Sequence, residues 1–113
     1  MEIVKEKITI TKLKKMAERM FGNLVKAVVD VEKKIMAVDG ELHADEQALL
    51  LENDSKQENL WGINIYPDKT GEDFIEFDSV INIRPSQQNR SRGVDNPEIK
   101  KIILEIINKL IER

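Results

Sequence analysis

The segment from residue 97 to 112 carries the pattern that most restricts the fold of this chain. Asn96 is a favourable N-cap and Pro97 suits the first position of a helix. Apolar side chains then recur at helical spacing as one continuous stripe: Ile99, Ile102, Ile103, Ile106, Ile107, Leu110 and Ile111. The pattern predicts an amphipathic helix over residues 97–112, and such a helix needs a second apolar surface to cover its stripe.

Short runs of β-branched residues earlier in the chain are expected to supply that surface. Strands are predicted over residues 2–6, 25–31 and 35–38. Residues 32–34, between the second and third of these runs, have the length of a hairpin connection. The middle of the chain is therefore expected to form antiparallel strands joined by short turns.

The next segment fits either a strand or a helix. Asp39 and Gly40 form a second hairpin signal, after which residues 41–44 are expected to return as a strand. The run QALLLE at residues 47–52 fits both periods, but the turn-forming cluster NDS follows it directly. We therefore predict a strand over residues 47–52.

Two further strands are predicted from alternating patterns. The run LWGINIYP places Trp61, Ile63 and Ile65 on one face, and Pro67 ends it. The run FIEFDSVINIR, residues 74–84, alternates over a greater length. It is predicted to be the longest strand, with its apolar face towards the core.

A helix near the N-terminus completes the predicted elements. Apolar residues at helical spacing run over residues 10–21, Thr9 can cap the first turn, and Gly22 or Asn23 can end the helix. The order of elements predicts a single α+β domain over residues 1–113. Its largely antiparallel meander of about five or six strands is expected to be covered on one face by the N-terminal and C-terminal helices.

Composition excludes several classes of function. The chain has 113 residues, of which 41% are hydrophobic and 35% charged, with a net charge of −3 and no cysteine. These values are typical of an ordered domain, and they exclude disulfides and thiolate chemistry. No apolar run is long enough to span a bilayer, and the N-terminus lacks the features of a signal peptide. We therefore expect a cytosolic protein with no membrane role.

The only histidine lies in the sequence GELHADEQ. His43, Asp45 and Glu46 are candidates for a divalent metal site or for acid–base chemistry. A structural zinc site needs about four ligands, and no other histidine or cysteine is present to complete one. We interpret the acidic region of residues 41–58 as a solvated edge, and we expect no tightly bound metal and no cofactor.

The stretch RPSQQNRSRGV, residues 84–94, differs in character from the rest of the chain. Guanidinium groups suit phosphate or carboxylate, and neutral donors and a helix N-terminus lie beside them. We predict that the loop of residues 84–93 binds an anionic ligand, either a phosphate-bearing small molecule or RNA. The candidate ligand-binding residues are Arg84, Ser86, Gln87, Asn89, Arg90, Ser91 and Arg92.

Three alternatives stay open at this point. The arginines can instead form ion pairs within the chain and hold the loop in place. A small ribonuclease-like or other hydrolytic enzyme would combine the arginines with His43 or a carboxylate across a concave pocket. A structural homo-oligomeric module is the third, since the apolar arc of helix 97–112 covers roughly 200° and one sheet covers less. The rest of the arc can be covered by the N-terminal helix of the same chain or by the same helix of a neighbouring chain, and we predict the second, a homodimer through this helix.

Several motifs together resemble one family. GELHADE, ALLLE, LWGINIYP, DFIEFDSVINIRPSQ and NRSRGV resemble a family of small prokaryotic proteins described as a domain of unknown function, over residues 3–111. The resemblance implies a prokaryotic source and a single-domain protein. It implies no activity and no catalytic residue.

Overall fold

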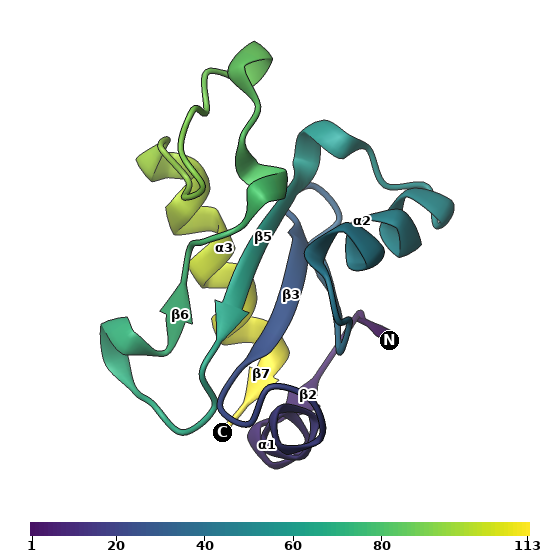
Figure 1. Cartoon of the computed structure of the whole chain (residues 1–113), viewed down its shortest axis with the longest axis vertical. Coiled ribbons are helices and arrows are strands. Elements are labelled where there is room, and N and C mark those ends of the chain that lie inside the picture. The colour runs from purple at the N-terminus through teal and green to yellow at the C-terminus, as the bar shows by residue number, and fades with distance from the viewer.

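The computed structural model describes residues 1–113 and places a twisted antiparallel sheet between helices (Figure 1). The sheet has five strands in the order β1-β4-β3-β5-β6, and a separate two-stranded pair joins β2 to β7. The elements are β1 (Glu2–Val4), β2 (Ile8–Thr9), α1 (Ile10–Arg19), β3 (Val25–Asp30), β4 (Ile35–Val38), α2 (His43–Glu52), β5 (Leu60–Ile65), β6 (Ile75–Glu76), α3 (Pro97–Leu110) and β7 (Ile111–Glu112). The predicted α+β class with an antiparallel sheet is confirmed.

Strand β3 is the centre of the sheet. It pairs antiparallel with β4 and with β5, so that Val28 lies opposite Ala37 on one side and Gly62 on the other. The predicted hairpin between β3 and β4 is confirmed. Gly62 is required here because a Cβ atom at this position would lie 2.6 Å from the Cβ of Ser79.

The main core lies between one face of the sheet and the helices α1 and α3. Val25, Ala27 and Val29 of β3 point into it, as period-2 alternation requires. The helices contribute Leu13, Met16, Ala17, Ile103, Ile106, Ile107 and Leu110. Thr9 caps α1 and Asn96 caps α3, each through its side-chain oxygen. Both predicted helices are confirmed, and each ends two residues earlier than predicted.

The opposite face of the sheet is covered by α2, which contradicts the strands predicted at residues 41–44 and 47–52. Leu50 packs against Val28, Ala37 and Leu60 in a smaller core. The buried positions of α2 are His43, Glu46 and Leu50. Two of these three residues are polar, so the spacing of apolar residues alone does not reveal that this segment is a helix.

The long strand predicted over residues 74–84 is also wrong. Only Ile75–Glu76 pairs with β5, and Val80–Asn82 forms a 3₁₀ turn. The side chain of Asn82 takes over the pairing with β5, because it accepts from Gly62 N at 2.8 Å and donates to Gly62 O at 3.0 Å. The side-chain amide of Asn82 thus replaces the backbone hydrogen bonds that a neighbouring strand would make with Gly62.

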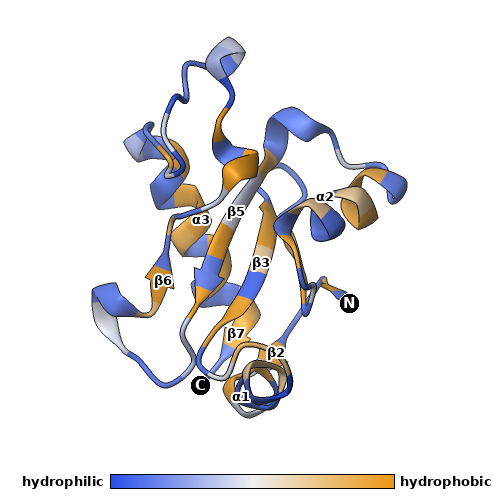
Figure 2. Cartoon of the chain, viewed as in Figure 1, coloured by the Kyte–Doolittle hydropathy of each residue, from blue (hydrophilic) through white to orange (hydrophobic).

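The pair of β2 and β7 joins the two ends of the chain. Ile8 lies opposite Ile111 in parallel register, directly before α1 and directly after α3. Figure 2 shows hydrophobic residues along β3 and α3 and mostly hydrophilic residues in the segment between β6 and α3. None of the helices has the length and apolar character needed to cross a membrane.

Candidate functional site

The arginine loop, defined as residues 84–93, runs from the end of the 3₁₀ turn Val80–Asn82 towards α3 and projects beyond the sheet (Figure 1). Arg84 and Asn89 close its first part, since Arg84 N donates to Asn89 O at 2.7 Å and Asn89 N donates to Arg84 O at 3.1 Å. The segment Pro85–Gln87 between them forms a 3₁₀ turn, and Gln88 adopts a left-handed conformation with φ of 61°. The loop therefore has a defined backbone.

Asn89 organises the rest of the loop. Its side chain is buried, and Nδ2 donates to the carbonyl oxygens of Asn82, Gly93 and Ser91 at 2.8, 2.9 and 3.2 Å. Its Oδ1 accepts from Asp95 N at 2.7 Å. One amide thus holds four backbone groups, so Asn89 shapes the loop from within.

Arg84 lies inside the protein, although the sequence places it among the candidate ligand-binding residues. It is 8% exposed, and its guanidinium donates to Leu60 O at 2.6 Å and to Gln57 O. The guanidinium also stacks on the ring of Trp61. Burial lowers the pKa of Arg84. These contacts join the loop to the start of β5.

The other two arginines are exposed but differ in their partners. Arg92 Nε donates to Asp78 Oδ1 at 2.5 Å, and this hydrogen bond raises the pKa of Arg92. The side chain of Arg90 forms no ion pair and no hydrogen bond, whereas its backbone N–H donates to Asp95 Oδ2 at 3.0 Å. Arg90 is therefore the one arginine of the loop whose side chain has no partner within the chain.

The neutral donors of the arginine loop are also divided. Gln87 Nε2 donates to Glu58 O at 3.0 Å, and Ser91 Oγ donates to Asp95 Oδ1 at 2.5 Å. The hydrogen bond from Ser91, followed by that from Arg90 N, lowers the pKa of Asp95. Ser86 is exposed and its hydroxyl has no partner within the chain. Ser86 and Arg90 are thus the free members of the predicted set.

A polar pocket of about 310 Å³ lies between the arginine loop and the start of α3. The residues that line it are Trp61, Gln87, Gln88, Asn89, Asp95, Asn96 and Ile99. The indole Nε1 of Trp61 is buried and has no hydrogen-bond partner in the chain. The sequence had indicated the loop, but it gave no signal that Trp61 would join it across the fold. For Asp95 and Asn96, the sequence offered one indication of a place in this pocket, which is their position next to the start of the predicted helix.

His43 lies apart from this pocket, on α2. Its Nε2 lies 2.8 Å from Ile63 O, and since a carbonyl only accepts, Nε2 carries the proton. Burial lowers the pKa of His43 despite that hydrogen bond. Asp45 is exposed, and no three histidine, aspartate or glutamate side chains form a group that could hold a metal ion.

Glu46 corrects the interpretation of residues 41–58 as a solvated edge. It is fully buried, and burial raises the pKa of its carboxyl to about 9. Oε2 accepts from Gly40 N at 2.9 Å, while Oε1 has no partner. A carboxylic acid buried in this way is neutral at neutral pH.

Fold and site together define a small α+β domain, with helices on both faces of an antiparallel sheet and a polar pocket at one end. The chain belongs to the family described as protein of unknown function (DUF5674), which matches residues 2–110. This match fits the expected small single-domain family of unknown function. No curated protein and no solved structure matches the chain.

Proposed function

We propose that this protein is a binding domain for a small anionic ligand, held by the arginine loop and the polar pocket beneath it. The observation that supports this most is the state of Arg90. Its guanidinium is exposed and unpaired, while its backbone is fastened to Asp95, which lines the pocket. Charge-assisted hydrogen bonds from such a group suit a phosphate or carboxylate.

The other candidate residues have different parts in this proposal. Arg92 keeps donors beyond the one it gives to Asp78, and Ser86 contributes a free hydroxyl. Gln87 and Ser91 line or brace the pocket through their hydrogen bonds. Arg84 and Asn89 act as supports that fix the loop in shape, since both are buried and bonded to backbone groups.

The dimensions of the pocket favour a small molecule over RNA. A volume of about 310 Å³ lies at the lower end of the range for small-molecule sites. Single-stranded RNA is usually bound by exposed aromatic rings on which bases stack. Trp61 is 2% exposed, and its ring is already covered by Arg84.

The hydrolytic alternative requires a base beside the arginines. His43 does not line this pocket, and its Nε2 is bonded to Ile63 O. Asp78 is close to Arg92, but the two form an ion pair with each other. No observation therefore favours the enzyme over the binding domain.

Titration calorimetry with inorganic phosphate and with adenosine monophosphate tests the proposal. Arg90→Ala is expected to weaken binding about tenfold or more, since a hydrogen bond to a charged group contributes about 1.5–3 kcal/mol. The melting temperature should stay unchanged, because the exposed side chain of Arg90 makes no hydrogen bond and no ion pair within the chain. Lys15→Ala is the matched control, since Lys15 is exposed, unpaired and on α1.

Three results of this experiment would contradict the proposal. The first is a parent protein that binds neither anion. The second is an Arg90→Ala variant that binds as tightly as the parent. The third is a single-stranded RNA oligomer that binds far more tightly than either small anion, which would replace the small ligand by RNA.

A further inference from the structure

A second positively charged region lies against the C-terminal half of α3, away from the arginine loop. It is a groove of about 660 Å³ whose lining includes two buried apolar side chains, Ile106 and Leu110. We call it the lysine groove. Its rim consists of five lysines and two glutamates: Lys5, Lys7, Lys33, Lys34, Lys109, Glu6 and Glu105.

Two strand pairings bring these lysines together from three distant segments. Val4 of β1 lies opposite Met36 of β4, which places Lys5 beside the turn between β3 and β4. Ile8 of β2 lies opposite Ile111 of β7, which places Lys7 beside the end of α3. The groove thus forms only when the chain folds, and no single segment of the sequence predicts it.

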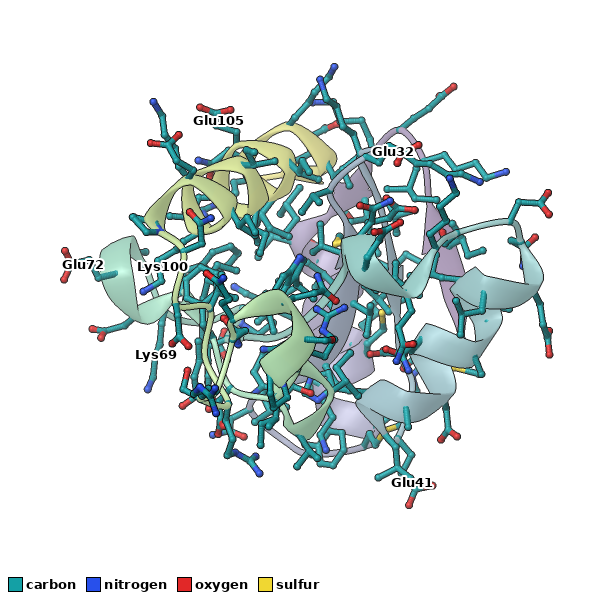
Figure 3. The ribbon with its side chains drawn as sticks, turned by 90° about the horizontal axis from the view of Figure 1, so that it is seen from above. Glu32, Glu41, Lys69, Glu72, Lys100 and Glu105 are labelled. Atoms are coloured by element: carbon teal, nitrogen blue, oxygen red, sulfur yellow. The ribbon has the colours of Figure 1, made fainter.

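The charge of the groove is largely uncompensated. Five lysines against two glutamates leave an excess of three positive charges, in a chain whose net charge is −3. The four ion pairs of the protein involve none of these five lysines. Only Lys33 has an acceptor for its ammonium, Asn53 O at 3.2 Å. In Figure 3, side chains tipped with nitrogen extend between the labelled Glu105 of α3 and Glu32 of the β3–β4 turn.

The buried carboxylate of Asp30 holds the turn that carries Lys33 and Lys34. Asp30 is 1% exposed, and its Oδ1 accepts from the backbone N–H groups of Glu32 and Lys33, both at 2.9 Å. Its Oδ2 accepts from Ser55 Oγ at 2.6 Å. The positions of the two lysines are therefore set before any ligand arrives.

Lys34 has a backbone conformation that is unfavourable for a residue with a Cβ atom. Its φ is 59°, in the left-handed region where glycine is the default residue. A lysine at this position destabilises the turn relative to glycine and places an ammonium at the rim of the groove. Such a conformation in a non-glycine residue is a reason to look for function.

We propose that the lysine groove binds a small molecule that carries two or more phosphate groups and an apolar part, such as a nucleoside diphosphate or triphosphate. Separate ammonium groups act as point charges for several phosphates. The buried surfaces of Ile106 and Leu110 suit the apolar part, and the volume is that of a small-molecule site. This site shares no residue with the arginine loop, so it does not depend on the function proposed above.

Titration calorimetry with tripolyphosphate and with adenosine triphosphate, without magnesium and at low salt, tests this proposal. Lys34→Gly and Lys109→Ala are each expected to weaken binding of both probes about two- to fivefold. Lys34→Gly should at the same time keep or raise the melting temperature, because glycine relieves the backbone conformation. Lys101→Ala is the matched control, since this exposed lysine of α3 is outside the groove.

The outcomes separate the sources of binding. Adenosine triphosphate bound more tightly than tripolyphosphate supports a contribution from the apolar floor, and equal affinities would overturn that part of the proposal. Equal binding by the parent and the Lys34→Gly and Lys109→Ala variants would overturn the site. A single-stranded RNA oligomer bound far more tightly than adenosine triphosphate would overturn the small molecule. Arg90→Ala is expected to leave binding of tripolyphosphate at the groove intact, so the two sites fail or succeed separately.

Discussion

The guanidinium carbon of Arg84 lies 4.1 Å from the centroid of the Trp61 ring, so the guanidinium stacks on the indole. Trp61 belongs to the main core, whereas Arg84 begins the arginine loop. The hydrogen bonds from Arg84 to Gln57 O and Leu60 O fasten the loop to the start of β5. Arg84 was predicted to contact a ligand, but its contacts within the chain support the loop instead.

Arg84→Ala is expected to lower the free energy of unfolding by about 2–4 kcal/mol, since it leaves the carbonyl of Leu60 without the donor of Arg84 and uncovers Trp61. Arg84→Lys should recover only part of this loss, because an ammonium cannot stack and donate in the same plane. Urea denaturation measures both variants. A change below about 0.5 kcal/mol for Arg84→Ala would show that the contacts of Arg84 carry no stability.

Asn89→Asp tests the role of Asn89 with almost no change in shape. A carboxylate at this position has no donor for the carbonyl oxygens of Asn82, Ser91 and Gly93, and it repels them. We expect a loss of about 2–4 kcal/mol in the free energy of unfolding. Ser86→Ala is the control within the arginine loop, since Ser86 is exposed and unbonded. An Asn89→Asp variant as stable as the parent would contradict the assignment.

Apolar periodicity predicted the parts of the fold in which it is undisturbed. The stripe of α3, the shorter stripe of α1 and the alternation of β5 all appear in the structure. It failed at α2, where His43 and Glu46 occupy buried positions. It failed again after β6, where the side chain of Asn82 replaces a strand ladder. Both failures come from polar residues that the fold buries: His43 and Glu46 in α2, and Asn82 after β6.

The candidate site was predictable only in part for the same reason. Local composition indicated the arginine loop, and Arg90 and Arg92 of this loop lie at the surface. Burial of Arg84 depends on Trp61 and on carbonyls more than twenty residues away, as its bond to Leu60 O shows. The lysine groove depends on two strand pairings between distant segments. Contacts of this kind are set by topology and leave no pattern in the local sequence.

The pKa of His43 can be measured without ambiguity, because it is the only histidine. Burial lowers this pKa below its ordinary value of 6.5. In the unfolded chain the ring takes up its proton first as the pH falls below 6.5, so His43 should reduce stability in acid. A titration followed by NMR should give a midpoint below 6.5. A midpoint at or above that value would contradict the buried, neutral state.

Self-association through α3 stays a prediction, and the structure narrows where to test it. Ile102 and Leu104 are 37% and 38% exposed, and a helix places them about 200° apart, so one interface cannot cover both equally. Leu104 borders a groove of about 640 Å³ that also includes Phe74 and Phe77, so its side offers the larger apolar surface. Leu104→Glu is therefore expected to dissociate a dimer more than Ile102→Glu does. Sedimentation equilibrium measures this, and a monomer at every accessible concentration would reject the dimer.

Glu46 should make the stability of the protein fall as the pH rises. Its pKa is about 9 in the folded state, mainly through burial, and 4.5 is its ordinary value. Between these values the unfolded chain releases a proton that the folded protein keeps, so each pH unit lowers the free energy of unfolding by about 1.4 kcal/mol. Glu46 then costs about 3 kcal/mol of stability at pH 7.

Glu46→Gln isolates this effect, because glutamine has nearly the same shape, can accept from Gly40 N and does not ionise. The other titrating groups are common to the parent and the variant, so they cancel in the comparison. Urea denaturation at pH 5 and pH 8 is expected to show a stability difference that shifts in favour of the variant by about 4 kcal/mol at the higher pH. A difference that stays constant between the two pH values would mean that Glu46 ionises as easily in the folded protein as in the unfolded chain.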